Sequence, residues 1–128
     1  MSLNSYRVGA TVAVSDMARA KEFYEGRLGL SAGMDDPDGG RTYECAGGTT
    51  IHVFPSPAGA GKSAATLAGW EVDDLERVVG DLTSRGVTFE KYTTPPFATD
   101  EKGIAVIGGS KSAWFKDPDG NTLGLIQR

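Results

Sequence analysis

The chain repeats one pattern of elements in its two halves, and this repeat constrains its fold more than any other feature. In the first half, residues 6–14 alternate apolar with small or polar side chains, which predicts a strand, and an apolar stripe predicts a helix over residues 17–28. The second half starts again with a predicted strand at 65–72 and a helix from residue 75 that Gly86 ends. Residues 16–19 (Asp-Met-Ala-Arg) align with residues 74–77 (Asp-Leu-Glu-Arg), so an aspartate precedes each helix as a candidate N-cap. The repeat predicts two β-α-β-β-β modules.

Further strands complete each module. They are expected at residues 30–34, 41–46 and 50–54 in the first half, and at 87–92, 105–107, 113–116 and 122–126 in the second. Residues 56–64, rich in Pro, Gly, Ser and Ala, are expected to be a linker, which divides a single domain over residues 1–128 into a module at about 5–55 and a module at 65–128. We therefore expect an α+β fold in which the two modules form a curved mixed sheet, with helices on the convex face and a ligand cavity on the concave face.

Composition narrows the functional classes. With 17 acidic and 13 basic residues and no cluster of Lys and Arg, the chain has a net charge of −4, which argues against nucleic acid as a partner. No stretch approaches the roughly 20 apolar residues of a membrane helix, and we expect no signal peptide at the N-terminus. The single cysteine, Cys45, has no partner for an intrachain disulfide and fits a half-buried thiol better than a nucleophile. These features predict a cytoplasmic protein that does not contact membranes.

One motif near the C-terminus points to a family. Residues 114–121 spell Trp-Phe-Lys-Asp-Pro-Asp-Gly-Asn, with Leu123 and Leu125 alternating after them, and this segment resembles the last hairpin of vicinal-oxygen-chelate proteins, the glyoxalase, bleomycin-resistance and dioxygenase-like superfamily. Residues 14–17, 23–24 and 28–30 resemble the family's first strand, helix and strand, and residues 70–75 resemble the start of its second module. The resemblance covers essentially the whole chain and implies the fold described above and a homodimer. Because Pro118 presets φ and Gly120 supplies a positive φ, we interpret the turn as architecture rather than as catalytic machinery.

The resemblance also implies where a metal would lie in the metal-dependent relatives. Their ligands project from the concave face of four strands, and motif spacing carries those positions to Gly9, His52, Leu67 and Gly124. Only His52 has a side chain that can bind a metal, and it is the only histidine of the chain. We therefore expect no metal and no other cofactor at the family's site, with a divalent metal held elsewhere as the disfavoured alternative.

The strand alternation selects the side chains that face the predicted cavity. If Ile51 and Val53 face the core, then Thr50, His52 and Phe54 face the cavity. A two-residue hairpin at Gly47-Gly48 would place Tyr43 opposite His52, with Arg41 and Cys45 on the same face. By the same alternation Thr122 points into the concavity, and the residues expected to bind a ligand are His52, Phe54, Tyr43, Trp114, Glu71, Arg7 and Thr11.

Two functions fit this pattern. The first is metal-independent binding of an aromatic or drug-like small molecule, because aromatic side chains occupy the concave positions while the metal-ligand positions are emptied. The second is an enzyme of the same fold, of the lyase, isomerase or dioxygenase type, that uses a non-standard metal site or acid–base chemistry from His52, with Glu71 or Tyr43 as further candidates. A blander alternative is that Trp114 and Phe54 pack at a contact between modules or subunits.

Overall fold

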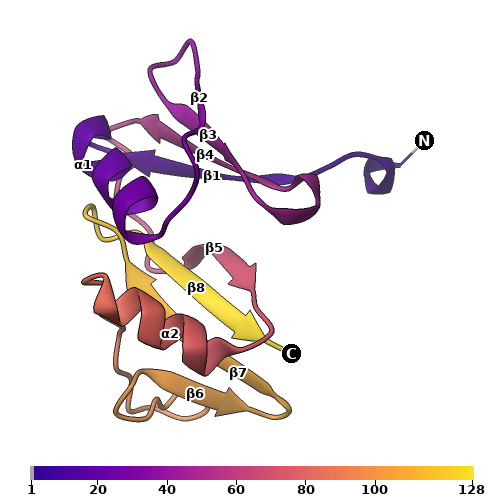
Figure 1. Cartoon of the computed structure of the whole chain (residues 1–128), viewed down its shortest axis with the longest axis vertical. Helices are drawn as coiled ribbons and strands as arrows, with labels where there is room; N and C mark the ends of the chain where they lie inside the picture. The colour runs from indigo at the N-terminus through magenta and orange to yellow at the C-terminus, as the bar shows by residue number, and fades with distance from the viewer. Residues whose placement is uncertain (1) are drawn as a thin grey trace.

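Two four-stranded sheets, one from each half of the chain, form the protein in a computed structural model that describes residues 2–128. In Figure 1 the first sheet lies above the second, and a helix lies beside each. The first sheet has the order β1-β4-β3-β2 and the second the order β5-β8-β7-β6, so the two modules share one topology. The strands are β1 (Gly9–Val14), β2 (Met34–Asp35), β3 (Arg41–Glu44), β4 (Thr50–Pro55), β5 (Thr66–Glu71), β6 (Ile104–Ile107), β7 (Ser110–Lys116) and β8 (Thr122–Gln127). This confirms the predicted α+β fold built from a duplicated unit, as two mixed sheets that are not closed into a barrel.

In each module the first and last strands pair in parallel, and the other strand pairs are antiparallel. β1 pairs with β4 and β5 pairs with β8 in parallel, while all other neighbouring strands of the two sheets pair antiparallel. A parallel pair needs a long crossover connection. In both modules the helix and the two strands that follow it in sequence supply this connection. The predicted repeat is therefore a repeat of topology as well as of sequence.

The helices begin and end where the sequence predicts. Helix α1 (Met17–Lys21) is capped by the Asp16 carboxylate, which accepts hydrogen bonds from the next turn, and it continues as the π-helical segment η2 (Glu22–Arg27). Asp74 caps helix α2 (Leu75–Ser84) in the same way. Gly29 and Gly86 follow the two helices with positive φ, a conformation that other residues rarely adopt. Short 3₁₀ turns occur at η1 (Leu3–Ser5) and η3 (Ala46–Gly48). Within residues 2–128, no helix has the length and apolar content needed to span a membrane.

Alternate strand residues build the core under the helices. Val12 and Val14 of β1, and Ile51 and Val53 of β4, are buried, whereas their neighbours in sequence are more exposed. Phe115 lies at the centre of an aromatic group, because its ring packs against Phe23 at 6.3 Å and against Phe89, Trp70 and other buried side chains. Since Phe23 belongs to the first module, this contact joins the two halves through one apolar core.

Two predicted strands are wrong in extent. The strand expected at residues 30–34 is reduced to the two residues of β2, and residues 87–92 form a single β-bridge, Phe89 to Phe115, rather than a strand. Val87 and Phe89 are nevertheless buried. Their alternation therefore reflects side-chain burial without the ladder of backbone hydrogen bonds that defines a strand.

The Asp-Pro-Asp-Gly-Asn turn binds the modules together. The Asp117 carboxylate accepts hydrogen bonds from the backbone N–H groups of Asp119 and Asn121, and from the Tyr24 hydroxyl at 2.8 Å. Asn121 donates to the Ala13 carbonyl at the end of β1. Burial, followed by the nearby Asp117 carboxylate, raises the pKa of Tyr24, so its phenol stays a hydrogen-bond donor. These contacts support the interpretation of the motif as architecture.

Candidate functional site

The face of the first sheet that points away from the core carries the polar residues expected from the strand alternation. Ile51 and Val53 are buried, and Thr50, His52 and Phe54 are partly exposed on the opposite face, as predicted. Thr11 of β1 lies beside His52 in the parallel ladder. The His52 ring stacks on Phe54, with ring centroids 5.7 Å apart and planes at 13°. The chain's only histidine is therefore fixed on an open sheet face.

The predicted pairing of Tyr43 with His52 is wrong by one residue. In the β3–β4 ladder Thr42 pairs with His52 and Tyr43 pairs with Ile51. The connection is the 3₁₀ turn η3, closed by a hydrogen bond from Cys45 N–H to the Thr49 carbonyl, rather than a two-residue hairpin. A register shift of one residue moves a side chain to the other face of the sheet.

The shift removes three side chains from the predicted cavity face. Tyr43 is 1% exposed and its hydroxyl donates to Glu25 at 2.8 Å. Arg41 pairs with Val53 in the ladder and forms an ion pair with Glu25 at 3.1 Å, while Cys45 packs against the core. Burial, followed by the hydrogen bond to Glu25, raises the pKa of Tyr43. This phenol therefore stabilises the helix contact instead of facing a ligand.

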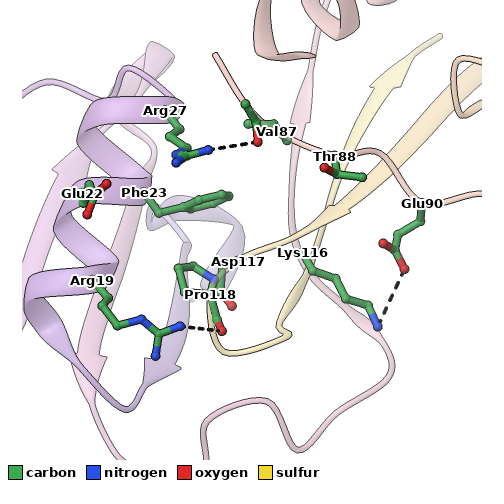
Figure 2. Close-up of a pocket in the computed structure, with 11 residues that line it drawn as sticks. Arg19, Glu22, Phe23, Arg27, Val87, Thr88, Glu90, Lys116, Asp117 and Pro118 are labelled. Atoms are coloured by element: carbon green, nitrogen blue, oxygen red, sulfur yellow. Dashed lines mark hydrogen bonds and ion pairs between the residues drawn. The ribbon is translucent and has the colours of Figure 1, made fainter. Parts of the chain in front are cut away.

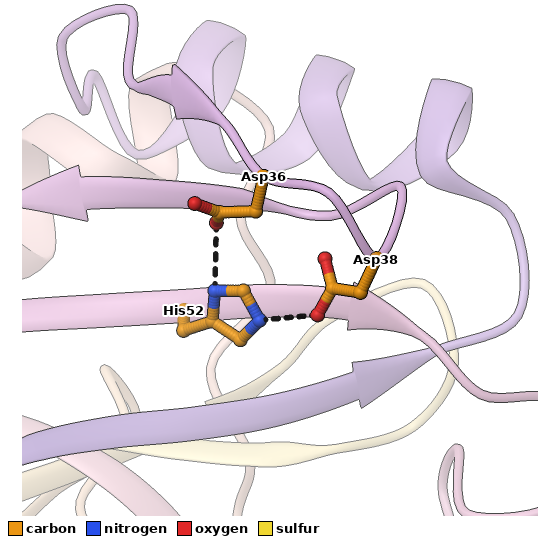
Figure 3. Close-up of side chains that lie close together, drawn as sticks. All are labelled: Asp36, Asp38 and His52. Carbon is orange, nitrogen blue, oxygen red and sulfur yellow. Dashed lines mark hydrogen bonds and ion pairs between the residues drawn. The ribbon is translucent and has the colours of Figure 1, made fainter.

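Two aspartates from the turn between β2 and β3 lie over His52, as Figure 3 shows. Asp36 Oδ2 is 2.9 Å from His52 Nδ1, and Asp38 Oδ2 is 2.8 Å from His52 Nε2. Thr42 donates from Oγ1 to Asp36 at 2.6 Å and also lies 2.9 Å from His52 Nδ1. A hydrogen bond from the Gly40 backbone N–H, followed by that from His52, lowers the pKa of Asp38. We call Asp36, Asp38 and His52 the His–Asp cluster.

The sequence analysis missed the two aspartates of this cluster. Residues 35–40 read as a turn by composition, and nothing in a turn motif indicates which strand it folds over. In the structure Asp36 N–H donates to the Gly40 carbonyl and Gly39 has a φ of 87°, so the turn bends back. The only signal in the sequence was the group of three acidic residues within residues 35–38, which is separated from the strand of His52 by one predicted strand.

An aromatic pocket of about 730 Å³ lies on the corresponding face of the second sheet. The Trp114 ring packs against Tyr92 at 5.5 Å and against Phe97 at 6.0 Å. Trp114 alternates with the buried Ala113 and Phe115 in β7, so it points away from the core, as the alternation predicts. Tyr92 and Phe97 come from the loop that precedes β6 and were not among the predicted residues. The rest of the lining is made by Ala64, Ala65, Thr66, Lys91, Thr93, Thr94 and Thr122.

Of the remaining predicted ligand residues, Glu71 and Arg7 lie outside both the His–Asp cluster and the aromatic pocket. Glu71 is exposed and forms an ion pair with Arg128 at 3.6 Å. Arg7 is exposed just before β1, with its guanidinium near Gly48. Thr11 borders the His–Asp cluster by its pairing with His52 but not the aromatic pocket. The predicted residues are thus distributed over separate parts of the surface.

The residues at the family's metal positions do not fit a metal. Gly9 and Gly124 have no side chain, and Leu67 packs against the core next to an irregularity in the β5–β8 pairing. Of the four positions only His52 offers a donor, and one imidazole does not make a metal site. We therefore derive no reaction step that uses a metal at these four positions.

A second depression, of about 370 Å³, lies between the helical segment of the first module and residues 86–90 (Figure 2). Arg19 donates to the Pro118 carbonyl at 3.3 Å and Arg27 donates to the Gly86 carbonyl at 3.0 Å. Lys116 lies 3.8 Å from Glu90. Because the two arginines are hydrogen-bonded across the junction, we interpret this depression as part of the contact between modules.

The duplicated β-α-β-β-β fold, with polar and aromatic features on open sheet faces, defines a two-module α+β protein. The chain belongs to the Glyoxalase/Bleomycin resistance protein/Dioxygenase superfamily, whose family model matches residues 7–125. No curated protein matches the chain.

Several solved structures are similar along their whole length. TnmS3, an antibiotic binding protein from Streptomyces sp. CB03234, is 26% identical with a TM-score of 0.70, and the match covers 95% of this chain and 94% of that one. A superfamily member from Sphaerobacter thermophilus is 27% identical with a TM-score of 0.67, over 96% and 97% of the two chains. The oxidase ChaP-H2 is 20% identical with a TM-score of 0.64, over 96% and 93%, and this likeness is one of fold.

Proposed function

We propose that this protein binds a small aromatic molecule in the pocket around Trp114 and needs no metal to do so. The observation that carries the proposal is the set of three rings, Trp114, Tyr92 and Phe97, gathered on a sheet face that points away from the core. Large aromatic side chains on an open face offer apolar contact to a flat ligand. Phe97 is 52% exposed, so part of this surface is free in the single chain.

The pocket has the size and chemistry of a small-molecule site. Its volume of about 730 Å³ lies within the roughly 300–1,000 Å³ of typical ligand pockets. The hydroxyls of four threonines add hydrogen-bonding groups, and among the described residues of the lining Lys91 is the one charged side chain. We therefore expect a neutral or anionic aromatic ligand in preference to a cationic one.

Two further observations support the proposal. Gly9, Leu67 and Gly124 provide no donor at the family's metal positions, so binding through a metal at that place lacks its ligands. The similar structure TnmS3 is an antibiotic binding protein, and at 26% identity it is a relative whose described role is binding. We extend binding of a small molecule, without its identity, to this chain.

The test compares the two tryptophans of the chain, since one lines the pocket and the other does not. Tryptophan fluorescence is recorded while 2-naphthoate, neutral 2-naphthamide and a cationic 2-naphthylmethylammonium salt are titrated into EDTA-treated protein. We expect saturable quenching, strongest with 2-naphthoate. We also expect affinity about tenfold weaker in Trp114→Ala, since an aromatic contact and its buried area are lost.

Trp70→Phe is the matched control, because Trp70 stacks on Phe115 and does not line this pocket. It should bind like the wild type. Equal weakening in both variants, or no saturable binding of any of the three probes, would refute the pocket at Trp114. Binding to untreated protein that is absent after EDTA treatment would refute metal independence.

We also propose that the protein forms a homodimer, as the family resemblance implies. Leu3 and Val8, at the N-terminal end of the first module, are 85% and 83% exposed. Exposed apolar side chains that gather in one segment favour contact with another surface. Light scattering coupled to size exclusion should give twice the mass of 13.4 kDa. The mass of one chain at micromolar concentration would rule this out.

A second candidate function, acid–base catalysis by His52, has one observation in its favour. The imidazole lies between Asp36 and Asp38, and one carboxylate can orient the ring while the other turns aside and leaves the second nitrogen to take a proton from a substrate. Tyr43 is buried on the other face and Glu71 pairs with Arg128, so neither assists it. If His52 is a base, an aryl methyl ketone that binds in D₂O should exchange its α-hydrogens faster with wild type than with His52→Gln. Equal exchange rates would exclude this role for that substrate class.

A further inference from the structure

We propose that the His–Asp cluster is a binding site for one divalent transition-metal ion of the Zn²⁺ class, distinct from the family's metal positions. The site would use one imidazole nitrogen of His52 and one carboxylate oxygen each of Asp36 and Asp38. It shares only His52 with the four family positions, because both aspartates come from the turn between β2 and β3. It does not depend on the aromatic pocket, which lies on the other sheet.

The donor atoms lie close enough for a rotation of one side chain to bring them onto one ion. One ligand atom from each residue lies within 4.8 Å of the others. Zn²⁺ binds nitrogen and carboxylate oxygen at about 2.0–2.2 Å, so two ligands on one ion are separated by at most about 4.4 Å. Because Asp36 and Asp38 contact different ring nitrogens, the carboxylate on the far side of the ring must rotate toward the nitrogen that holds the ion, and the Asp38 side chain, which is 47% exposed, has room to do so.

The charges of the cluster favour a cation. Two carboxylates converge on one imidazole, so the three side chains together carry negative charge whether or not the ring is protonated. Arg41 is the nearest arginine along the chain, and its ion pairs go to Glu25 and Asp35. Among the ion pairs of residues 2–128, those of Asp36 and Asp38 are made with His52 alone. A divalent ion on a ring nitrogen would compensate the charges of both carboxylates.

Neighbouring groups orient each ligand in the cluster. Thr42 donates a hydrogen bond to Asp36, and the Gly40 backbone N–H donates to Asp38 Oδ1 at 2.8 Å, which leaves Asp38 Oδ2 directed at His52. The stacked Phe54 ring restricts the imidazole. Groups that orient ligands from behind in this way raise the affinity of metal sites. Figure 3 shows the two carboxylates on opposite sides of the ring, so binding requires one of them to swing toward the nitrogen that the ion occupies.

The ligand set also predicts which ions bind. An imidazole nitrogen with two carboxylates suits Zn²⁺ and Co²⁺, whereas Mg²⁺ and Ca²⁺ prefer oxygen ligands only. Three protein ligands would leave one position of a tetrahedral ion for water. We therefore expect Zn²⁺ to bind more tightly than Co²⁺, and neither Mg²⁺ nor Ca²⁺ to compete at equal concentration.

The experiment titrates ZnCl₂ and CoCl₂ into the tag-free full chain by calorimetry, with Co²⁺ absorption as a second signal. We expect one ion per chain and affinity at least about tenfold weaker in each of Asp36→Asn, Asp38→Asn and His52→Gln. Asp35→Asn is the matched control, because Asp35 is adjacent in sequence but pairs with Arg41. It should bind like the wild type. Circular dichroism checks that the variants are folded.

Three results would overturn the site. The first is an absence of Zn²⁺ binding to the wild type, which would leave an ion-free histidine held by two aspartates. The second is equal weakening in Asp35→Asn, which would indicate attraction to acidic charge in general. The third is unchanged binding in His52→Gln, and if that variant were unfolded, line broadening of the His52 resonances of wild type by Mn²⁺ would decide the question. Binding of 2-naphthoate at Trp114 is measured in EDTA, so failure of the metal site leaves the proposed function standing and the reverse also holds.

Discussion

Replacing Asn121 with alanine should destabilise the protein more than any single change at its surface. Asn121 is 1% exposed and its amide makes three hydrogen bonds. It accepts from Gly61 N–H at 3.0 Å and donates to the Ala13 carbonyl at 2.8 Å and to the Asp117 carboxylate at 2.9 Å. Through these bonds one side chain joins the linker, the end of β1 and the last turn.

The expected loss follows from those three bonds. A bond to a neutral backbone group contributes about 1 kcal/mol and a bond to a charged group about 1.5–3 kcal/mol, so the free energy of unfolding should fall by roughly 4 kcal/mol. With a urea m-value of about 2 kcal/mol/M, the midpoint should fall by about 2 M.

Urea unfolding followed by circular dichroism measures this change. Asn4→Ala is the control, since Asn4 is exposed and is the only other asparagine in the chain. Its free energy of unfolding should stay within about 0.5 kcal/mol of wild type. A loss below about 1 kcal/mol in Asn121→Ala would refute the view that this turn holds the modules together.

Three further predictions test the packing around this turn. Tyr24→Phe removes the hydrogen bond to Asp117 and should lower the free energy of unfolding by about 2 kcal/mol in the same urea assay; a change near zero would contradict it. Burial raises the pKa of Tyr24 and Tyr43, so these phenols ionise at lower pH in the unfolded chain than in the folded one. Stability should therefore fall as pH rises above about 10, and it should fall less steeply in Tyr24→Phe. A urea midpoint that is constant from pH 9 to about 11 would contradict this pH dependence. Gly61→Ala should destabilise the protein by more than about 1 kcal/mol, because φ is 65° at this residue and a Cβ would collide with the Asp119 carbonyl. Gly80→Ala lies in open space on α2 and should stabilise the protein by about 0.5–1 kcal/mol. Thermal melts in which Gly61→Ala is the more stable variant would contradict both expectations.

Much of the fold can be predicted from the sequence because its signals are local. The caps at Asp16 and Asp74, and the positive φ of Gly29 and Gly86, depend on a few neighbouring residues. The burial of alternate residues in β1 and β4 depends only on the two-residue period of a strand. The repeat then fixes how these pieces combine, because each half must bury one helix on one sheet.

The candidate site was predicted less well because it depends on loops. The position of Tyr43 depended on the length of the β3–β4 connection, and one additional residue in η3 moved it to the other face. Asp36 and Asp38 meet His52 only because a turn folds back over the sheet, and no periodicity encodes that contact. Tyr92 and Phe97 likewise come from a loop beside Trp114. Trp114 itself was predicted because it lies on a regular strand.

Ligand binding at Trp114 is tested most directly by the indole N–H signals of the two tryptophans in ¹H–¹⁵N NMR spectra. The protein is kept in EDTA and titrated with 2-naphthoate, and the signals are assigned with Trp70→Phe. We predict that the Trp114 signal shifts and saturates while the Trp70 signal stays in place, because only Trp114 lines the pocket on the open sheet face. Movement of Trp70 alone would place the ligand in one of the two pockets that Trp70 lines, beside Leu28 and Val78 or beside Gly9 and Glu71, and would contradict binding at Trp114.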